Sequence, residues 1–487
     1  MNECVKAAFC RIWDKDFVVD SLHNKKLTGK DFFSAVMHCK QQLESLGLCK
    51  QDKICLLMNN SLDLVVMYFA CLFMQLIIIP IDPHKGQREI DEILKIVNGK
   101  KIFCDKTSEY RGTDVVAIES IMDKFYASNG DEIGDISLID ALDFSHIYLI
   151  TFTSGTTGVC KGVRHSFNNL VASARAFNNR FNFDQQNIFY HNVPMTYMAG
   201  ILNLIILPFV AGSTIVLGPR FDVSQVMNFW DVPIGQGVNT FWFVPTMLSL
   251  LLRFDRGNKG ADYLRAVKAI GCVGTAPLNV LVKKQFEEKY GVCLYESYGL
   301  SETLFVATNS ASLNMNGSVG TLLDGVTVSV EDDGELLVSV PWMFLGYMNM
   351  DSKQDFVRSG FKSGDIGAFG VHKFLFITDR KKDLIIRGGI NISPARLNRF
   401  INETGFFEEN VVVGVTDDIM GEKNVCFFVK ETIFERDLEK KLNMKIMHDL
   451  GTSYCIDEFI KMDIIPKNLN GKVDALKLRE FYCKNHS

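Results

Sequence analysis

Residues 151–162 read TFTSGTTGVCKG, and this stretch decides how the rest of the chain is interpreted. It holds three glycines, five hydroxyl side chains and one lysine, Lys161, and it follows an apolar segment at 147–150. Glycines let backbone N–H groups come close to phosphate oxygens, hydroxyls add donors, and a lysine meets negative charge. Because glycine follows Lys161, the stretch differs from the GxxxxGK[ST] loop. It therefore predicts a phosphate-binding loop of another kind.

The segments around this loop alternate between helical and extended patterns. Apolar positions at helical spacing in 31–46 precede the strand-like 53–58, and a helix-like 65–74 precedes the strand-like 76–81. Further short apolar runs lie at 101–105, 241–245, 269–273 and 292–295. This alternation predicts an α/β fold, with parallel-type sheets flanked by helices in a large N-terminal domain.

The pattern changes after Gly317. Short strand-like segments at 327–330, 335–340 and 374–378 predict a small β-barrel-like subdomain. A charged stretch, DRKKD at 379–383, follows, and the remaining residues read as mixed α/β with a helix near 437–450. We expect an N-terminal domain over 1–380 and a small α+β C-terminal domain over 381–487.

Composition limits the class of protein. A single core rarely exceeds about 250–300 residues, so 487 residues predict at least two domains. A net charge of −5 gives no basic excess for nucleic acid. The apolar run at 64–79 is 16 residues long and contains Gln75, which makes it too short for a membrane span. Thirteen cysteines without a CxxC pair, and the lack of a secretory signal pattern, predict a reducing, cytoplasmic location.

Several motifs, in order, resemble those of the adenylate-forming (ANL) superfamily. This superfamily includes acyl- and aryl-CoA synthetases, luciferases and the adenylation domains of peptide synthetases. TSGTTG-x-x-KG resembles its phosphate-binding signature. The other matching motifs are GTAPL at 274–278, YESYGLSET at 295–303, GSVG at 317–320, GY at 346–347, SGD at 363–365, DRKKDLIIRGGINISP at 379–394 and PKNLNGKV at 466–473. The resemblance covers nearly the whole chain.

The resemblance implies a two-step reaction that consumes ATP with Mg²⁺. A carboxylic acid is joined to AMP, and the acyl group then passes to a thiol. Lys472, Glu302 and Lys161 would be catalytic, with Glu302 holding Mg²⁺, because preorganised charge must meet the charge of the phosphates. The implied nucleotide-binding residues are Thr153, Ser154, Gly155, Thr156, Thr157, Gly158, Lys161, Gly274, Ala276, Pro277, Ser297, Tyr298, Gly299, Ser301, Asp365, Arg380 and Lys472.

The resemblance also implies a moving C-terminal domain. Lys382 falls at the position of the family's hinge, about which the small domain rotates between two arrangements. In the second arrangement, Gly388 and Gly389 would line the tunnel through which the thiol arrives, because glycine lets the pantetheine arm pass close to the backbone.

The implied acid pocket is mostly apolar. Its candidate residues are Tyr197, Met198, Trp242, Thr275 and Phe305, which favour a small to medium aliphatic or aromatic acid. The absence of an aspartate between Pro194 and Gly200 disfavours an amino acid. In contrast, GKVD at 471–474 is nearer to the carrier-loading branch of the family. The acceptor is therefore either coenzyme A or the phosphopantetheine of a carrier protein.

Two functions of other classes share these motifs. A luciferase-like oxygenase would oxidise its own adenylate, and oxygen consumption would distinguish it. A catalytically silent nucleotide-binding protein need not keep Lys161, Glu302, Asp365, Arg380 and Lys472 together, and their joint presence argues against it.

Overall fold

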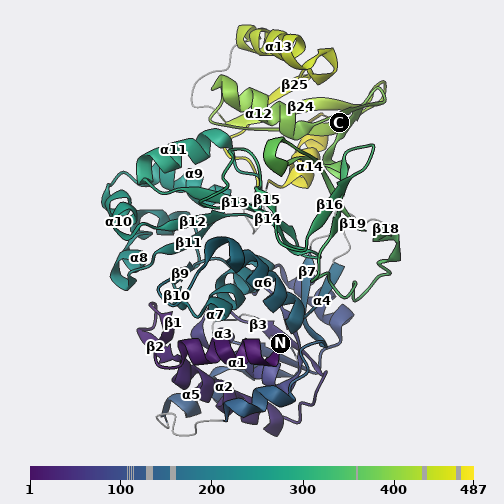
Figure 1. The fold of residues 1–487 in the computed structure, drawn as a ribbon. Helices are drawn as coiled ribbons and strands as arrows, with labels where there is room; N and C mark the ends of the chain where they lie inside the picture. The colour runs from purple at the N-terminus through teal and green to yellow at the C-terminus, as the bar shows by residue number, and fades with distance from the viewer. Residues whose placement is uncertain are drawn as a thin grey trace.

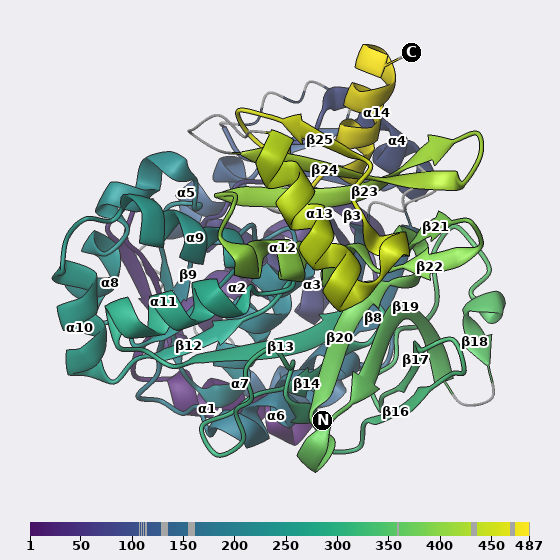
Figure 2. The ribbon, with the colours of Figure 1, turned by 90° about the horizontal axis from the view of Figure 1, so that it is seen from above.

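The computed structural model describes residues 1–106, 108, 110, 112, 114–127, 135–153, 161–357, 360–429, 436–467 and 473–486. The N-terminal residues lie at one end of the molecule and the residues after about 385 form a unit at the other (Figure 1). Seen from above, β23, β24 and helices α12, α13 and α14 lie over the rest of the chain (Figure 2).

The first sheet has six strands and lies in the N-terminal part of the chain. Its order is β6 (Val115–Ala117), β5 (Lys101–Cys104), β3 (Lys53–Leu57), β4 (Ile77–Pro80), β7 (Ile147–Thr153) and β8 (Lys161–Ser166). The pairs from β6 to β7 are parallel, and β8 joins β7 antiparallel. The predicted phosphate loop therefore connects two neighbouring strands.

The second sheet has nine strands. Its order is β15 (Thr321–Leu322), β14 (Leu304–Thr308), β13 (Leu294–Leu300), β12 (Ile270–Val273), β11 (Thr240–Phe243), β9 (Ile188–His191), β10 (Thr214–Leu217), β1 (Asp16–Asp20) and β2 (Lys25–Thr28). Strands β13 to β1 run parallel, and antiparallel pairs close both ends. The parallel α/β core predicted from the alternating pattern is confirmed.

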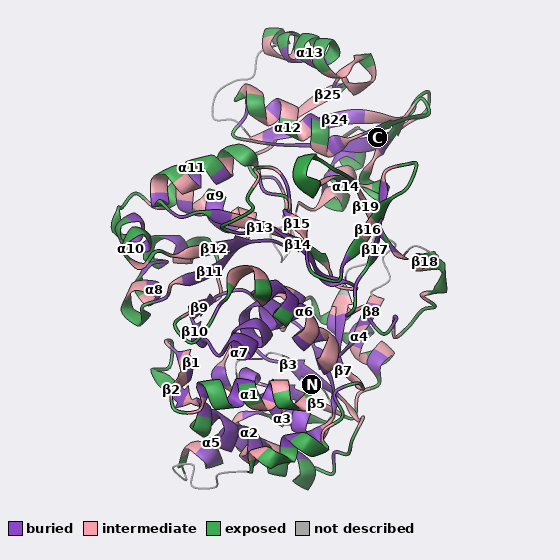
Figure 3. Cartoon of the chain, in the orientation of Figure 1, coloured by how far each residue is buried: buried purple, intermediate pink, exposed green. Residues whose placement is uncertain are grey.

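The largest apolar core joins the two sheets. It includes residues of α2 (Gly29–Ser45), α3 (Leu62–Met74), α6 (Phe167–Phe181) and the π-helical turn η2 (Ala199–Ile206). Figure 3 shows α3 and α6 buried in the interior. Every residue of α3 except Asp63 is buried, and Gln75 ends the helix in a left-handed conformation (φ 53°). The apolar run at 64–79 is therefore a buried helix followed by β4.

Other helices cover the sheets and the connections between strands. They are α1 (Asn2–Ile12), α4 (Gln87–Val97), α5 (Glu119–Ala127), α7 (Leu207–Ala211), α8 (Asp231–Gln236), α9 (Pro245–Phe254), α10 (Lys259–Val267) and α11 (Val280–Tyr290). Among the described residues, none of the helices is both long and apolar enough to cross a membrane.

Two smaller sheets follow. The third contains β16 (Thr327–Val330), β17 (Glu335–Ser339), β18 (Phe356–Val357), β19 (Gly360–Phe369) and β20 (Leu375–Arg380), and all its pairs are antiparallel. The fourth contains β21 (Ile385–Arg387), β22 (Ile390–Ile392), β23 (Glu409–Asp417), β24 (Gly421–Val429) and β25 (Glu458–Lys461). The antiparallel unit predicted after Gly317 is thus present.

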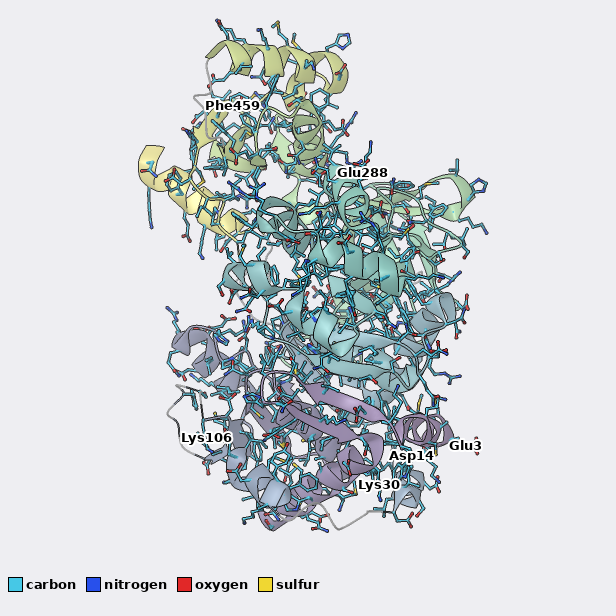
Figure 4. All side chains as sticks on the ribbon, turned by 90° about the vertical axis from the view of Figure 1, so that its left-hand side faces the viewer. Glu3, Asp14, Lys30, Lys106, Glu288 and Phe459 are labelled. Atoms are coloured by element: carbon cyan, nitrogen blue, oxygen red, sulfur yellow. The ribbon has the colours of Figure 1, made fainter. Side chains whose placement is uncertain are left out.

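The last hundred residues pack around cores of their own. Two apolar clusters are made of residues between Ile385 and Tyr482, and helices α12 (Pro394–Thr404), α13 (Arg436–Leu450) and α14 (Ala475–His486) complete this unit. In the side-chain view, Phe459 marks this unit, Glu288 of α11 marks the neighbouring part of the molecule, and Asp14 and Lys30 mark the opposite end (Figure 4).

Candidate active site

A cavity of about 720 Å³ lies where the first three sheets meet. Its wall includes Pro80 from β4, Lys161 from β8, Leu300 from β13 and Arg380 from β20, and the turn after β12 adds Thr275. These residues come together because β4 and β12 both end at the cavity. Ligands of parallel α/β sheets usually bind at the carboxyl ends of the strands.

One wall of the cavity carries a linked set of polar residues. Asp365, in β19, is 3% exposed, and Arg380 faces it across the strand pair. Arg380 Nε donates to Asp365 Oδ1 over 2.7 Å, and the Tyr298 hydroxyl donates to Oδ2 over 2.6 Å. Asp365 therefore holds the guanidinium of Arg380, which lines the cavity.

The charges of this set are fixed by burial and by one another. Burial and the neighbouring Asp365 raise the pKa of Tyr298 well above its usual value, so the phenol stays a neutral donor. Burial opposes the charge of Arg380, but Asp365 and the other negative groups around it together raise the pKa of the guanidinium. Arg380 is thus a permanent cation held in one orientation.

Glu302 and Lys161 also line the cavity. The Tyr347 hydroxyl donates to Glu302 Oε1 over 2.8 Å, and the backbone N–H of Phe344 donates to the Glu302 carbonyl over 3.0 Å. Lys161, at the start of β8, places its Nζ 4.9 Å from the centre of the Tyr347 ring. A cation and a carboxylate therefore face the same space.

Mg²⁺ is the metal implied by the sequence resemblance, and Glu302 fits it. Within the described ranges, no group of three or more His, Cys, Asp or Glu side chains could hold a metal. Mg²⁺ at phosphate-transfer sites takes one or two carboxylates, with substrate phosphates and water as its other ligands. Glu302 lines the cavity, and a carboxylate has acceptor capacity beyond its bond to Tyr347.

The predicted adenine turn follows β12. Ser297 donates to the Val273 carbonyl over 3.0 Å, and a side chain at Gly274 would come within 3.1 Å of the Ser297 hydroxyl. Thr275 has φ 76°, and its buried Oγ1 lacks a hydrogen-bond partner within the described structure. Ala276 is half-buried and Pro277 exposed, and Gly299 and Ser301 line the cavity.

The predicted acid-pocket residues divide into two groups. Tyr197 and Thr275 lie on the cavity wall, and burial raises the pKa of Tyr197. Met198, Trp242 and Phe305 are buried behind it. Phe305 stacks on Phe177 of α6 with 4.2 Å between ring centres, and Trp242 lies 5.7 Å from Phe305. These three support the pocket as core residues.

The predicted hinge and tunnel residues lie after β20. Lys382 lines the cavity, and burial lowers the pKa of its ammonium group. Gly388 and Gly389 have φ of 57° and 80° and form the turn between β21 and β22. The Gly388 N–H donates to the Met420 carbonyl over 2.7 Å, which anchors this turn within the C-terminal unit.

Several predicted residues fall outside the described part of the chain. Ser154, Gly155, Thr156, Thr157 and Gly158 in the phosphate loop, and Lys472, lie outside the described residues, as does the side chain of Thr153.

Sequence reasoning missed the part of the wall that follows β4. Asp82 and Lys85 line the cavity, and Arg220 donates to both oxygens of Asp82 over 3.0 and 2.9 Å. The sequence did contain a signal for Asp82 and Lys85. Both are polar residues that follow an apolar parallel strand, and the carboxyl end of such a strand is where ligands usually bind. Arg220 is 138 residues from Asp82 and could not be linked to it from the sequence.

Comparison with known proteins gave consistent matches. The family model described as AMP-binding enzyme matches residues 7–348. The 2-succinylbenzoate–CoA ligase of Listeria monocytogenes serovar 1/2a is 27% identical, over 94% of this chain and 95% of its own length. The corresponding ligase of Bacillus pumilus is also 27% identical, over 94% and 93%.

Solved structures share the fold. ATP-bound MatB from Rhodopseudomonas palustris superimposes with a TM-score of 0.84 at 21% identity over 100% of both chains. The o-succinylbenzoate CoA synthetase (MenE) from Bacillus subtilis, in complex with the acyl-adenylate intermediate OSB-AMP, superimposes with a TM-score of 0.82 at 22% identity, over 98% of this chain and 97% of that one.

Proposed function

The chain belongs to the AMP-binding enzyme family, within the ANL superfamily. From that premise we propose which residues of its cavity act in each step of the reaction. The protein is an AMP-forming acid–thiol ligase. It uses ATP to convert a carboxylic acid into an acyl-AMP and then forms a thioester. The observation that carries the proposed assignment is that Arg380, held by Asp365, lines one cavity together with Glu302 and Lys161.

In the proposed first half-reaction, Arg380 contacts the ribose and the α-phosphate, and Asp365 accepts hydrogen bonds from ribose hydroxyls. An acid oxygen attacks the α-phosphorus, the bond from that phosphorus to the bridging oxygen breaks, and pyrophosphate leaves. Bound Mg²⁺, held by Glu302, would neutralise charge on the phosphates. Lys161 lies at the pyrophosphate end, and Lys472 stabilises the charge that develops during attack.

The protonation states of Arg380 and Tyr298 support these proposed roles. Arg380 stays charged because Asp365 holds it, and Tyr298 stays a neutral donor because it is buried. A carboxylate substrate that enters between Arg380 and Tyr197 meets a permanent cation and a phenol. Such preorganised donors lower the barrier without reorganising during the reaction.

We propose a mostly apolar aromatic or aliphatic acid as the substrate. Tyr197 and Thr275 lie on the cavity wall, while Met198, Trp242 and Phe305 are buried core residues. The relatives named above are ligases of 2-succinylbenzoate, so this acid is the first to test.

We propose coenzyme A as the acceptor, which is the thiol named in those relatives. A carrier-protein phosphopantetheine is the alternative, favoured by GKVD at 471–474. Gly388 and Gly389, in a positive-φ turn without side chains, would let a pantetheine arm pass close to the backbone.

We also propose that the domain boundary lies at 380/381, with Lys382 as the hinge. The separate apolar cores between Ile385 and Tyr482 support a C-terminal unit that can move as a body. Free thiols at described cysteines from Cys4 to Cys483 support a reducing compartment, the cytoplasm.

ATP–pyrophosphate exchange tests the proposed function. With Mg²⁺ and a panel of aromatic, aliphatic, hydroxy and amino acids, we expect exchange with 2-succinylbenzoate or another apolar acid. Lys472→Ala should lower the exchange rate by about a hundredfold or more, the size of effect found for single groups that stabilise a transition state. AMP release should then accelerate with coenzyme A. Acceleration by a phosphopantetheinylated carrier protein alone would overturn the proposed acceptor.

A further inference from the structure

We propose that His165 is a positioning residue, which sets the Mg²⁺ response of the site by holding the Ser301–Glu302 turn. The proposal rests on the proposed role of Glu302. His165 lies in β8 on the same face as Lys161, because alternate residues of a strand share a face. Its side chain is 0% exposed, so it makes no contact with substrate and acts through the turn.

The key contact is a short hydrogen bond to the backbone. His165 Nε2 lies 2.6 Å from the Ser301 carbonyl oxygen, which can only accept, so Nε2 carries the proton. Nδ1 is buried and has no hydrogen-bond partner in the described part of the chain. The ring is therefore a neutral donor aimed at one carbonyl, since a second N–H on Nδ1 would be buried without an acceptor.

The turn that receives this bond is held from several directions. Phe344 N–H donates to the Glu302 carbonyl over 3.0 Å, and Trp342 Nε1 donates to the Thr303 carbonyl over 2.9 Å. Consecutive carbonyls at 301, 302 and 303 thus each have a donor. Tyr347 bonds the Glu302 carboxylate itself, and the His165 bond is the one that comes from the strand carrying Lys161.

This link couples the two sides of the phosphate site. The segment 345–348 also pairs with β8, through Leu345 N–H to the Arg164 carbonyl over 2.8 Å and Met348 N–H to the Gly162 carbonyl over 2.7 Å. Strand β8 therefore fixes both the Ser301 carbonyl and Tyr347, the two groups that orient Glu302. Without His165 the Ser301 carbonyl would lose this donor, and the turn would shift to find another.

The chain offers a matched control in His191. This histidine is also 0% exposed, also donates from Nε2 to a backbone carbonyl, that of Gly200 over 3.0 Å, and also has an unpartnered Nδ1 within the described residues. Burial lowers the pKa of both imidazoles to about 4. The Gly200 bond, however, holds the segment that carries Tyr197 and Met198, so the two histidines should affect the use of different substrates.

The test compares His165→Leu, His165→Gln and His191→Leu in the full-length protein. ATP–pyrophosphate exchange is measured against Mg²⁺, ATP and acid concentration. We expect His165→Leu to raise the Mg²⁺ concentration for half-maximal exchange about tenfold with the KM for the acid little changed. His165→Gln, which keeps a donor near Nε2, should restore most of the Mg²⁺ response. His191→Leu should instead raise the KM for the acid.

Two further experiments test the same proposal. If His165→Leu fails to fold, His165→Asn, whose shorter amide cannot reach the carbonyl, replaces it against His165→Gln. In a Glu302→Gln background, His165→Leu should add nothing to the Mg²⁺ defect, because both changes act through one carboxylate. Unchanged Mg²⁺ dependence in folded His165→Leu, or equal Mg²⁺ shifts in His165→Leu and His191→Leu, would overturn the proposal.

Failure of the proposed function gives a different result. Wild-type protein without exchange for any acid would contradict adenylation, and the His165 proposal is then tested by calorimetric titration of ATP with and without Mg²⁺. We expect Mg²⁺ to tighten ATP binding to wild-type protein about tenfold more than to His165→Leu. An equal effect of Mg²⁺ on both would contradict the positioning role alone.

Discussion

Asp365 and Arg380 face each other across β19 and β20, and their pairing explains how one wall of the cavity holds a fixed positive charge. The carboxylate receives donors from two different elements, Tyr298 in β13 and Arg380 in β20. Both donors need an acceptor, and a carboxylate has one oxygen for each.

Asp365→Asn should therefore weaken nucleotide binding and the fold together. The amide NH₂ would face a donor, which leaves one group unsatisfied and should cost about 1–2 kcal/mol, the lower part of the usual range because Arg380 is 42% exposed. The KM for ATP in pyrophosphate exchange should rise at least about tenfold. Asp231→Asn, which removes an exposed carboxylate paired with Lys259, is the control. An unchanged KM for ATP in Asp365→Asn would contradict its proposed role.

Thr275 is a β-branched residue in the left-handed region, with φ 76°. Such strain costs about 1–3 kcal/mol and is typical of functional sites. Thr275→Gly should raise the free energy of unfolding by about 1 kcal/mol, because glycine removes the strain but loses more backbone entropy.

The same change should raise the KM for the acid or for ATP, because glycine removes a side chain from a lining residue and frees the backbone of the turn. Urea denaturation and exchange kinetics measure the two effects. A less stable Thr275→Gly protein would show that side-chain packing outweighs the strain.

Strand β9 ends at His191, which ties the strand to the start of the π-helical turn η2 through the Gly200 carbonyl. Burial lowers the pKa of His191 to about 4, below the value of about 6.5 expected in an unfolded chain. The unfolded chain therefore binds the proton first, and falling pH favours unfolding between about pH 6.5 and 4.

Replacing His191 by Gln should remove this contribution. The difference between the two pKa values corresponds to roughly 3 kcal/mol, lost from the wild-type protein as pH falls from 7 to 4. Denaturation of both proteins across this range should show a shallower decline for His191→Gln. Parallel pH curves would show that His191 is not neutral in the folded protein.

The C-terminal unit has its own cores and meets the rest of the molecule around β20 and α12. Asp379 at the end of β20 accepts a hydrogen bond from the backbone N–H of Ala395 over 3.1 Å and from the Ser393 hydroxyl at the start of α12. Between them lies the short turn η6 (Lys381–Asp383), where the hinge is proposed.

Lys382→Pro should separate the two half-reactions if this turn is the hinge. Proline fixes φ near −65°, which suits one arrangement and opposes rotation to another. We expect pyrophosphate exchange to remain near the wild-type rate and thioester formation to fall at least about tenfold. Lys382→Ala, which removes the same side chain without fixing φ, is the control. Equal losses in both half-reactions would contradict the hinge proposal.

Much of the molecule follows from patterns that are local in the sequence. The alternation of strands and helices predicted the parallel sheets, the apolar run interrupted by Gln75 predicted a buried helix and strand, and 437–450 predicted α13. Each depends on side-chain spacing over a few residues, which sets the exposed and buried faces of an element directly. The ordered motifs likewise placed Lys161, Glu302 and Arg380, which all line one cavity.

Tertiary structure alone decided which residues meet. It buried Met198, Trp242 and Phe305 away from the cavity wall, joined Arg220 to Asp82 across 138 residues, and joined His165 to Ser301 across 136 residues. These outcomes depend on strand order and register, because a shift of one residue turns a strand's side chains to the opposite face. Register is set by packing of the whole core, so no local pattern in the chain encodes these contacts.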